Sequence, residues 1–418
     1  MIASDEPRQK SPPWLNPRRI RAHAILLALS LWGICALDYA TPGIFDRAGN
    51  IKFQDFLPFY ISSQLIAQHR ADQLYDPQTQ RHEIEAIVGQ PTRVEVPNLY
   101  GPQVGLLFVP LAGFSFSAAA GVWAALGVVI YFVCVYAVWK DCPALRAHAG
   151  FVVLAACAFP PLFHVFVRAQ ISALILACFT AALLAFRADR SFLAGIALGV
   201  LILKPQFLIA IPLILLFAQA WSPLAGLLLS AAAQLSLARL YFGSDVMRAY
   251  LDMFLHPARW IGTAELSLAP IQMHSLRSFW SLLIPSSDVA LALYALSSLA
   301  ILAMAAVIFR CDTSLPLRFS SLILAAILVN PHLFVYDLIA LVPVLLLIIN
   351  WTMENPQHPS SPLLRLLCYL AFILPLFGPL SRWTHFQLSV VAFVGLQWTL
   401  FRFRTAGHKL ASHESRVV

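Results

Sequence analysis

One carboxylate lies in the longest polar interval of a chain that is otherwise mostly apolar. That interval covers residues 38–103, and within it Asp55 lies among aromatic residues that include Phe53, Phe56 and Tyr60. A carboxylate beside apolar rings at a membrane surface loses part of its hydration, which makes it a better proton acceptor. The pattern therefore favours Asp55 as a general base. The alternatives are a solvated loop aspartate and aromatic residues that only anchor the loop at the interface.

Charged residues also interrupt the apolar runs further along the chain. Lys204 follows the apolar run 199–203 and precedes Pro205. An ionisable residue at membrane depth is costly, so each one is expected to have a partner or a function. Lys204 is therefore either a cation for a phosphate group or a lysine whose long side chain reaches the membrane surface.

Several other polar residues are predicted to lie on the same side of the membrane as Asp55. Transfer from a lipid phosphate would need a carboxylate base and cations that hold the leaving phosphate. Arg168 and Arg277 are alternatively ordinary cations at a span end and in a loop. His332 is alternatively a core histidine, and Asp337 the partner of a nearby cation in an ion pair. The predicted substrate-binding residues are Tyr60, Arg168, Gln170, Lys204, His274, Arg277, His332, Tyr336 and Asp337.

The composition is that of an all-α polytopic membrane protein. Of the 418 residues, 60% are hydrophobic and only 11% are charged, whereas soluble domains carry about 25% charged residues. The formal net charge of +8 does not indicate nucleic-acid binding, because the basic residues cluster at the ends of apolar segments. The seven cysteines show no CxxC or Cys/His spacing, so neither disulfides nor a metal site is predicted. No nucleotide-binding motif is present, and no cofactor is expected.

The apolar runs predict about twelve transmembrane helices in one domain, residues 20–401. Residues 1–19 are expected to be disordered, and residues 402–418 to form a basic cytoplasmic tail. The run 104–114 is too short to cross a membrane alone and is expected to dip into it. The predicted spans are 20–37, 118–139, 148–165, 171–187, 191–203, 205–219, 223–240, 286–309, 317–330, 333–350, 363–380 and 385–401.

Basic residues predict the orientation of these spans. The connections 140–147, 187–190 and 310–318 carry Lys or Arg, which favours the cytoplasmic side for them and for both termini. The loops 38–103 and 241–285 are then outside, with short interfacial helices near 56–69 and 77–88. Since several spans are short or broken by proline, we expect an outward-facing cavity between these two loops.

Four blocks of the sequence follow one another in a fixed order. They are Asp55-Phe56 with Tyr60 and Leu74-Tyr75-Asp76; Tyr100-Gly101-Pro102 with Phe108-Val109-Pro110-Leu111-Ala112 and Trp123; Arg168-Ala169-Gln170 with 194–199 and Leu203-Lys204-Pro205; and Asn330-Pro331-His332 with Tyr336-Asp337-Leu338. In this order the blocks resemble the pattern of glycosyltransferase family 87. Two departures occur: Ala169 stands where the family usually has Gly, and Gly101 where it often has Pro. Neither removes a reactive group.

The resemblance implies a GT-C fold and transfer of a sugar, typically mannose, from a polyprenyl-phosphate donor to a glycan or glycolipid acceptor. It assigns to Asp55 the role of base in an inverting transfer, at the periplasmic side of the inner membrane. Asp38, just after the first span, is the competing carboxylate. The rival functions are a lipid or oligosaccharide transporter, which would more naturally show repeated halves, and a non-catalytic membrane protein of an envelope complex.

Overall fold

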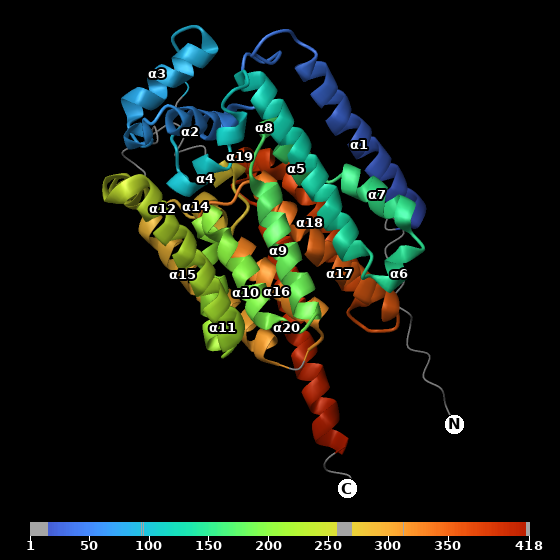
Figure 1. Cartoon of the computed structure of the whole chain (residues 1–418). Coiled ribbons are helices and arrows are strands. Elements are labelled where there is room, and N and C mark those ends of the chain that lie inside the picture. Colours follow the sequence, from blue (N-terminus) through green and yellow to red (C-terminus); the bar gives the residue numbers. More distant parts are fainter. Residues whose placement is uncertain (1–15, 93, 95, 257–269, 312, 415–418) are drawn as a thin grey trace.

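The structure is a computed structural model that describes residues 16–92, 94, 96–256, 270–311 and 313–414; the prediction for residues 1–15 lies outside it. The described residues fold into helices packed side by side, with two isolated β-bridges at Phe45–Ile51 and Met273–Phe334. Figure 1 shows a bundle with several short helices gathered at one end. This all-helical membrane architecture confirms the predicted fold class.

Each of the twelve predicted apolar runs is helical. Among the described residues, six helical units are long and apolar enough to cross a membrane, and a pair bent by 48° would be a seventh. The shorter helices end at proline or polar breaks, so they are not long enough to cross alone. The long units are α1 (Pro17–Tyr39), α5 (Phe116–Trp139), α12 (Trp221–Leu255), α15 (Ser287–Arg310), η7–α17 (Val335–Glu354) and α18–α19 (Ser361–Thr384); the bent pair is α7 (Ala149–Cys157) with α8 (Pro160–Arg168). The shorter units are α9 (Ser172–Arg187), α10–η4 (Ser191–Leu203), η5–α11 (Pro205–Phe217), α16 (Leu315–Leu328) and the apolar part of α20 (Leu388–Glu414).

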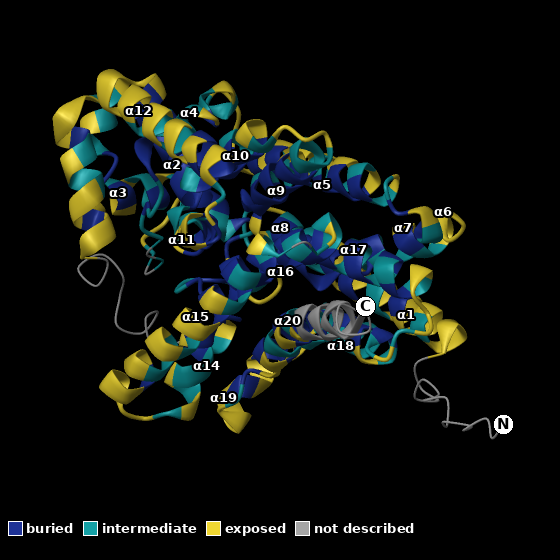
Figure 2. Ribbon diagram, turned by 90° about the horizontal axis from the view of Figure 1, so that it is seen from below, coloured by how far each residue is buried: buried dark blue, intermediate teal, exposed yellow. Residues whose placement is uncertain are grey.

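The helices differ in how deeply they are buried in the bundle. Nearly every residue of α16 from Leu317 to Leu328 is buried. In contrast, α1, α12 and α15 carry exposed apolar side chains such as Leu29, Leu240 and Leu296, and Figure 2 shows exposed residues along these helices. Exposed apolar rows of this kind are expected to face lipid, where they cost nothing.

The predicted connections meet at one end of the bundle, which we call the basic end (residues 140–147, 187–190 and 310–318). An ion pair of 2.5 Å joins Arg187 to Asp141, and a single cavity is lined by residues from both 187–191 and 309–318. The expected grouping of these connections is therefore confirmed. Helix α5 begins at the opposite end of the bundle and ends at Trp139, beside the basic end. Its 24 residues are about 36 Å long, so the two ends of the bundle are separated by about this distance.

The described residues between 40 and 115 form a cap over the end of the bundle opposite the basic end. The cap contains η1 (Gln54–Phe56), α2 (Leu57–Ala67), η2 (Ala71–Gln73), α3 (Pro77–Val88), α4 (Pro102–Leu106) and η3 (Val109–Leu111). The predicted helix 77–88 is confirmed, with Asp76 capping its first turn through the Thr79 amide at 2.9 Å. Since α4 and η3 are short, the run 104–114 does not cross as a span, as expected.

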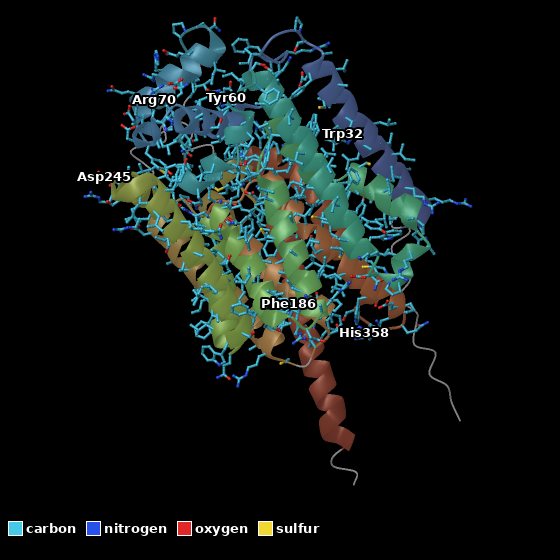
Figure 3. All side chains as sticks on the ribbon, viewed as in Figure 1. Trp32, Tyr60, Arg70, Phe186, Asp245 and His358 are labelled. Carbon is cyan, nitrogen blue, oxygen red and sulfur yellow. The ribbon has the colours of Figure 1, made fainter. Side chains whose placement is uncertain are left out.

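The helix predicted at 56–69 is present as α2, and it lies inside the cap. Nine of its eleven residues are buried, because α2 forms the core of the cap rather than its surface. Phe56 and Phe59 pack on Phe108 with ring centroids 5.5 and 4.8 Å apart. The aromatic residues around Asp55 therefore serve mainly to build the cap, and Figure 3 shows Tyr60 and Arg70 within it.

The second half of α12 packs against the cap. This helix continues fifteen residues past the predicted end at 240 and bends at Gly243, whose φ is +83°. Beyond the bend, Val246 and Met253 are buried in the core of the cap, and Tyr250 packs on Tyr75 at 5.7 Å. Residues 241–255 thus form a wall beside the cap, while residues 257–269 of the same predicted loop lie outside the described residues.

Candidate active site

Asp55 lies on the face of the cap that meets the bundle. It is the middle residue of η1, which follows Phe53 in the left-handed region at φ +57°. Its side chain is 23% exposed, and it accepts hydrogen bonds from Arg168 Nη1 at 3.4 Å and Gln170 Nε2 at 3.1 Å. The structure therefore brings the predicted base together with two of the predicted binding residues, from an element more than a hundred positions away.

Both hydrogen-bond partners of Asp55, Arg168 and Gln170, lie at the turn between α8 and α9. Ala169 occupies the left-handed region at φ +47°, a conformation that glycine adopts more readily, which explains why glycine suits this position. The Ala169 and Gln170 amides donate to the carbonyls of Phe166 and Val165 and so end α8. As a result Arg168 and Gln170 reach Asp55, while Ser172 begins α9.

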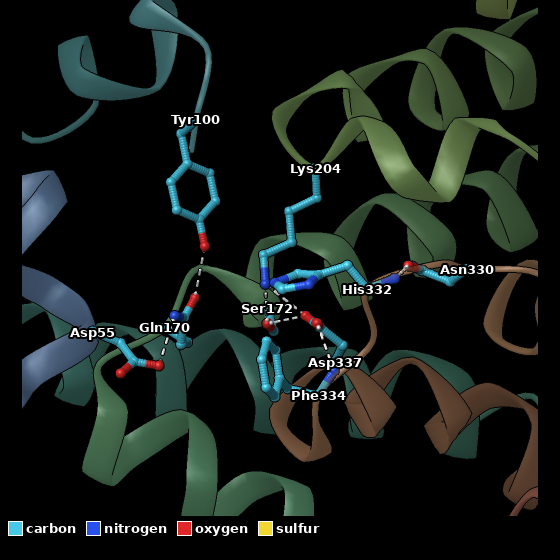
Figure 4. Close-up of polar contacts among 9 residues, drawn as sticks. All are labelled: Asp55, Tyr100, Gln170, Ser172, Lys204, Asn330, His332, Phe334 and Asp337. Carbon is cyan, nitrogen blue, oxygen red and sulfur yellow. Dashed lines mark hydrogen bonds and ion pairs between the residues drawn. The ribbon is translucent and has the colours of Figure 1, made fainter. Parts of the chain in front are cut away.

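Tyr100 fixes the orientation of the Gln170 amide. The Tyr100 hydroxyl donates to Gln170 Oε1 at 3.2 Å, which leaves Nε2 to face Asp55 (Figure 4). Burial first, and then the negative charges of Asp337 and Asp55, raise the pKa of Tyr100 well above its ordinary value, so that the phenol remains a donor. Sequence reasoning missed Tyr100 as a site residue. The signal that could have found it is its place in the Tyr100-Gly101-Pro102 block.

Lys204 and Asp337 form a buried ion pair beside this group. Lys204 Nζ lies 2.6 Å from Asp337 Oδ1, and the two side chains are 2% and 1% exposed. Ser172 donates to Asp337 Oδ1 at 2.7 Å and accepts from Lys204 at 3.1 Å (Figure 4). The alternative in which Lys204 reaches the membrane surface is therefore wrong. The ion pair considered for Asp337 is present, and Lys204 is its cation.

Tyr336 and His332 complete this second group. Lys204 Nζ lies over the Tyr336 ring, 4.7 Å from its centroid. His332 follows Asn330, whose side chain accepts the His332 backbone N–H at 2.9 Å. Burial lowers the pKa of His332 to about 4, although the nearby Asp337 carboxylate acts in the opposite direction. At neutral pH the imidazole is consequently uncharged and can donate one N–H, which makes it a polar contact rather than a cation.

Three predicted binding residues have other surroundings. His274 is fully buried, with Nδ1 2.8 Å from Ser389 Oγ, and its backbone N–H donates to Leu333, so it supports the loop that carries His332. The Tyr60 hydroxyl donates to the Phe114 carbonyl at 2.7 Å inside the cap. Arg277 is the second residue of α14 (Leu276–Leu283), and its exposed side chain carries a charge that contributes to lowering the pKa of His332. The described residues contain no group of three His, Cys, Asp or Glu suited to a metal ion.

The comparisons with known proteins identify the family of the chain. Residues 98–335, more than half of the chain, match the family model of glycosyltransferase family 87. The match includes Tyr100, Gln170, Lys204 and His332, whereas Asp55 lies before its start. No curated protein and no solved structure matches the chain. With its apolar helices and this match, the chain belongs to glycosyltransferase family 87 and is a membrane glycosyltransferase.

Proposed function

We propose that this protein transfers a sugar, typically mannose, from a polyprenyl-phosphate donor to a glycan or lipid-linked acceptor, with inversion at the sugar carbon. The observation that carries the proposal is the position of Asp55: a carboxylate that is partly exposed, held by two donors and located where the cap meets the membrane bundle. A donor that is already linked to a lipid enters from the membrane and needs no nucleotide-binding domain.

In the proposed step Asp55 accepts the proton of the acceptor hydroxyl. The hydroxyl oxygen attacks C1 of the sugar, and the bond between C1 and the phosphate oxygen breaks with its electron pair going to the phosphate. Gln170 and Arg168 hold the carboxylate during this proton transfer. General-base catalysis of this kind contributes about 10²–10⁴-fold to the rate.

The leaving phosphate needs positive charge, and we assign that role to Arg168 before Lys204. The Arg168 side chain is 46% exposed and uses one nitrogen on Asp55, so that its other N–H groups remain available. The charge of Lys204 is already matched by Asp337 in the interior. In this proposal Lys204, Asp337 and Tyr336 together form one wall of the donor-binding site. His332 offers one further N–H to the donor.

The donor class is tested with purified protein in reconstituted membranes. We expect transfer from a radiolabelled polyprenyl-phosphate sugar to acceptors in a lipid extract, and no transfer when a nucleotide sugar replaces it. A panel of lipid-linked sugars identifies which one is used. Transfer from a nucleotide sugar alone would contradict the proposal. Movement of the lipid-linked sugar across the membrane without transfer would favour the transporter function.

We further propose that the basic end faces the cytoplasm and that the cap lies on the outer side of the inner membrane, because cytoplasmic connections are enriched in Lys and Arg. The exposed residues Asp72 in the cap and Ala147 at the basic end allow a direct test. In spheroplasts an impermeant maleimide is expected to label an Asp72→Cys variant, and an Ala147→Cys variant only after permeabilisation. The wild-type protein controls for native cysteines. The opposite labelling pattern would reverse the orientation.

A further inference from the structure

The last residue of α1 contacts both of the segments that carry the ion pair of the candidate active site. Tyr39 ends α1, and its hydroxyl donates to the Val167 carbonyl at 2.7 Å. Val167 immediately precedes Arg168 in the sequence. This hydrogen bond therefore holds the backbone of α8 one residue before the cation that meets Asp55.

The ring of Tyr39 also packs on the segment that leads to Asp55. It meets the ring of Phe53 edge to face, with centroids 4.9 Å apart and planes at 67°. Phe53 lies two residues before Asp55, at the start of η1. Both rings meet Phe166 of α8, with centroid distances of 6.2 Å from Tyr39 and 6.3 Å from Phe53. Aromatic pairs of this kind contribute to stability beyond their buried area, so three rings from α1, the cap and α8 hold these elements together.

Lys52 fastens the same segment of the cap to the end of α1. Its ammonium donates to three backbone carbonyls, those of Tyr39 at 3.5 Å, Thr41 at 2.5 Å and Gly43 at 3.1 Å. Hydrogen bonds from a charged donor are about twice as strong as neutral ones. Because Lys52 lies three residues before Asp55, these contacts fix the path of the chain into η1.

We propose that Tyr39 is a positioning residue for the sugar transfer, because it sets the position of Arg168 relative to Asp55. It acts through Val167 on one side and through Phe53 on the other. The contact that depends on it is long, 3.4 Å between Arg168 Nη1 and Asp55 Oδ1, so a small displacement of the end of α8 breaks it. The effect on turnover rests on the proposed function, whereas the coupling of the two segments is independent of any substrate.

Amide hydrogen exchange of the purified full-length protein in detergent tests the coupling without a substrate. The amides of Ala169 and Gln170 are hydrogen-bonded to carbonyls of α8, and the Phe56 amide is hydrogen-bonded within η1. Tyr39→Phe removes only the hydroxyl, so exchange at Ala169 and Gln170 should become about tenfold faster and exchange at Phe56 should not change. Tyr39→Leu also removes the ring, and Phe56 should then exchange faster as well. Wild-type exchange at Ala169 and Gln170 in both variants would overturn the proposal.

Turnover measures the consequence for the reaction. With a polyprenyl-phosphate sugar as donor, Tyr39→Phe is expected to lower kcat about tenfold and to change KM less, because displaced catalytic groups lose rate. In an Arg168→Gln background the same substitution should cost much less, since its effect passes through that residue. An equal loss of kcat in both backgrounds would show that the hydroxyl acts elsewhere and would overturn the proposal.

Tyr131→Phe is the matched control. The buried Tyr131 hydroxyl donates to the Ala156 carbonyl at 3.0 Å, so this variant removes a hydrogen bond of the same type from the interior of the bundle. Neither kcat nor exchange at the turn that carries Gln170 should change.

The two measurements separate this inference from the proposed function. If the wild type transfers no sugar from any polyprenyl-phosphate donor while Tyr39→Phe shows the expected exchange, the proposed function fails and the coupling stands. If Asp55→Asn is inactive while Tyr39→Phe exchanges and turns over like the wild type, the coupling fails and the proposed function stands.

Discussion

The Lys204→Met variant is expected to lose about 3–5 kcal/mol of unfolding free energy, because it leaves the Asp337 carboxylate as an uncompensated charge in the interior. The two side chains are almost completely buried and only 2.6 Å apart. Ser172 remains beside Asp337, but one hydroxyl donor does not neutralise a carboxylate. Unfolding of the purified variant in detergent, followed by circular dichroism against denaturant, measures the loss.

Two companion variants separate this effect from donor binding. Replacing both members, Lys204→Met with Asp337→Leu, removes the buried charge altogether and is expected to recover most of the lost stability. Lys140→Met removes an exposed lysine from the basic end and should change stability little. If Lys204→Met unfolds like the wild type but binds the lipid-phosphate donor more weakly, Lys204 is a phosphate ligand instead of a structural partner.

The membrane-embedded part of the fold could be predicted from the sequence because it depends on local signals. Length and apolarity locate each run, and proline marks the breaks: the run 191–203 ends before Lys204-Pro205 in the structure as it does in the sequence. The Lys and Arg residues of the connections indicated which of them share one end of the bundle. The family resemblance was confirmed over residues 98–335.

The pairings within the site could not be predicted in the same way, because they join residues distant in sequence. Nothing local shows that Lys204 meets Asp337, which lies 133 positions away, or that Gln170 reaches Asp55 across 115 positions. The burial of the helix predicted at 56–69 could not be predicted for a related reason. A short apolar helix has the same sequence pattern whether or not other elements cover it, and only the packing of α3, α4 and η3 around α2 makes it the core of the cap.

Asp55→Asn is expected to lower turnover by about 10²–10⁴-fold, the usual contribution of a general base. The amide keeps the size of the side chain and one oxygen for Gln170 or Arg168, but it does not accept the acceptor's proton as a carboxylate does. Donor binding should be largely retained, since Arg168 stays in place. Asp38→Asn removes a carboxylate at the end of α1, outside the contacts of Asp55, and is expected to cost much less.

The most direct measurement compares these two variants with the wild type in reconstituted membranes, using one polyprenyl-phosphate sugar as donor. The rate of transfer and the affinity for the donor are determined in the same preparation. If Asp55 is the base, Asp55→Asn loses about 10²–10⁴-fold in rate at nearly unchanged donor affinity, while Asp38→Asn stays close to the wild type. Near wild-type turnover by Asp55→Asn, with Asp38→Asn or Asp337→Asn inactive but folded, would contradict the assignment and place the base elsewhere.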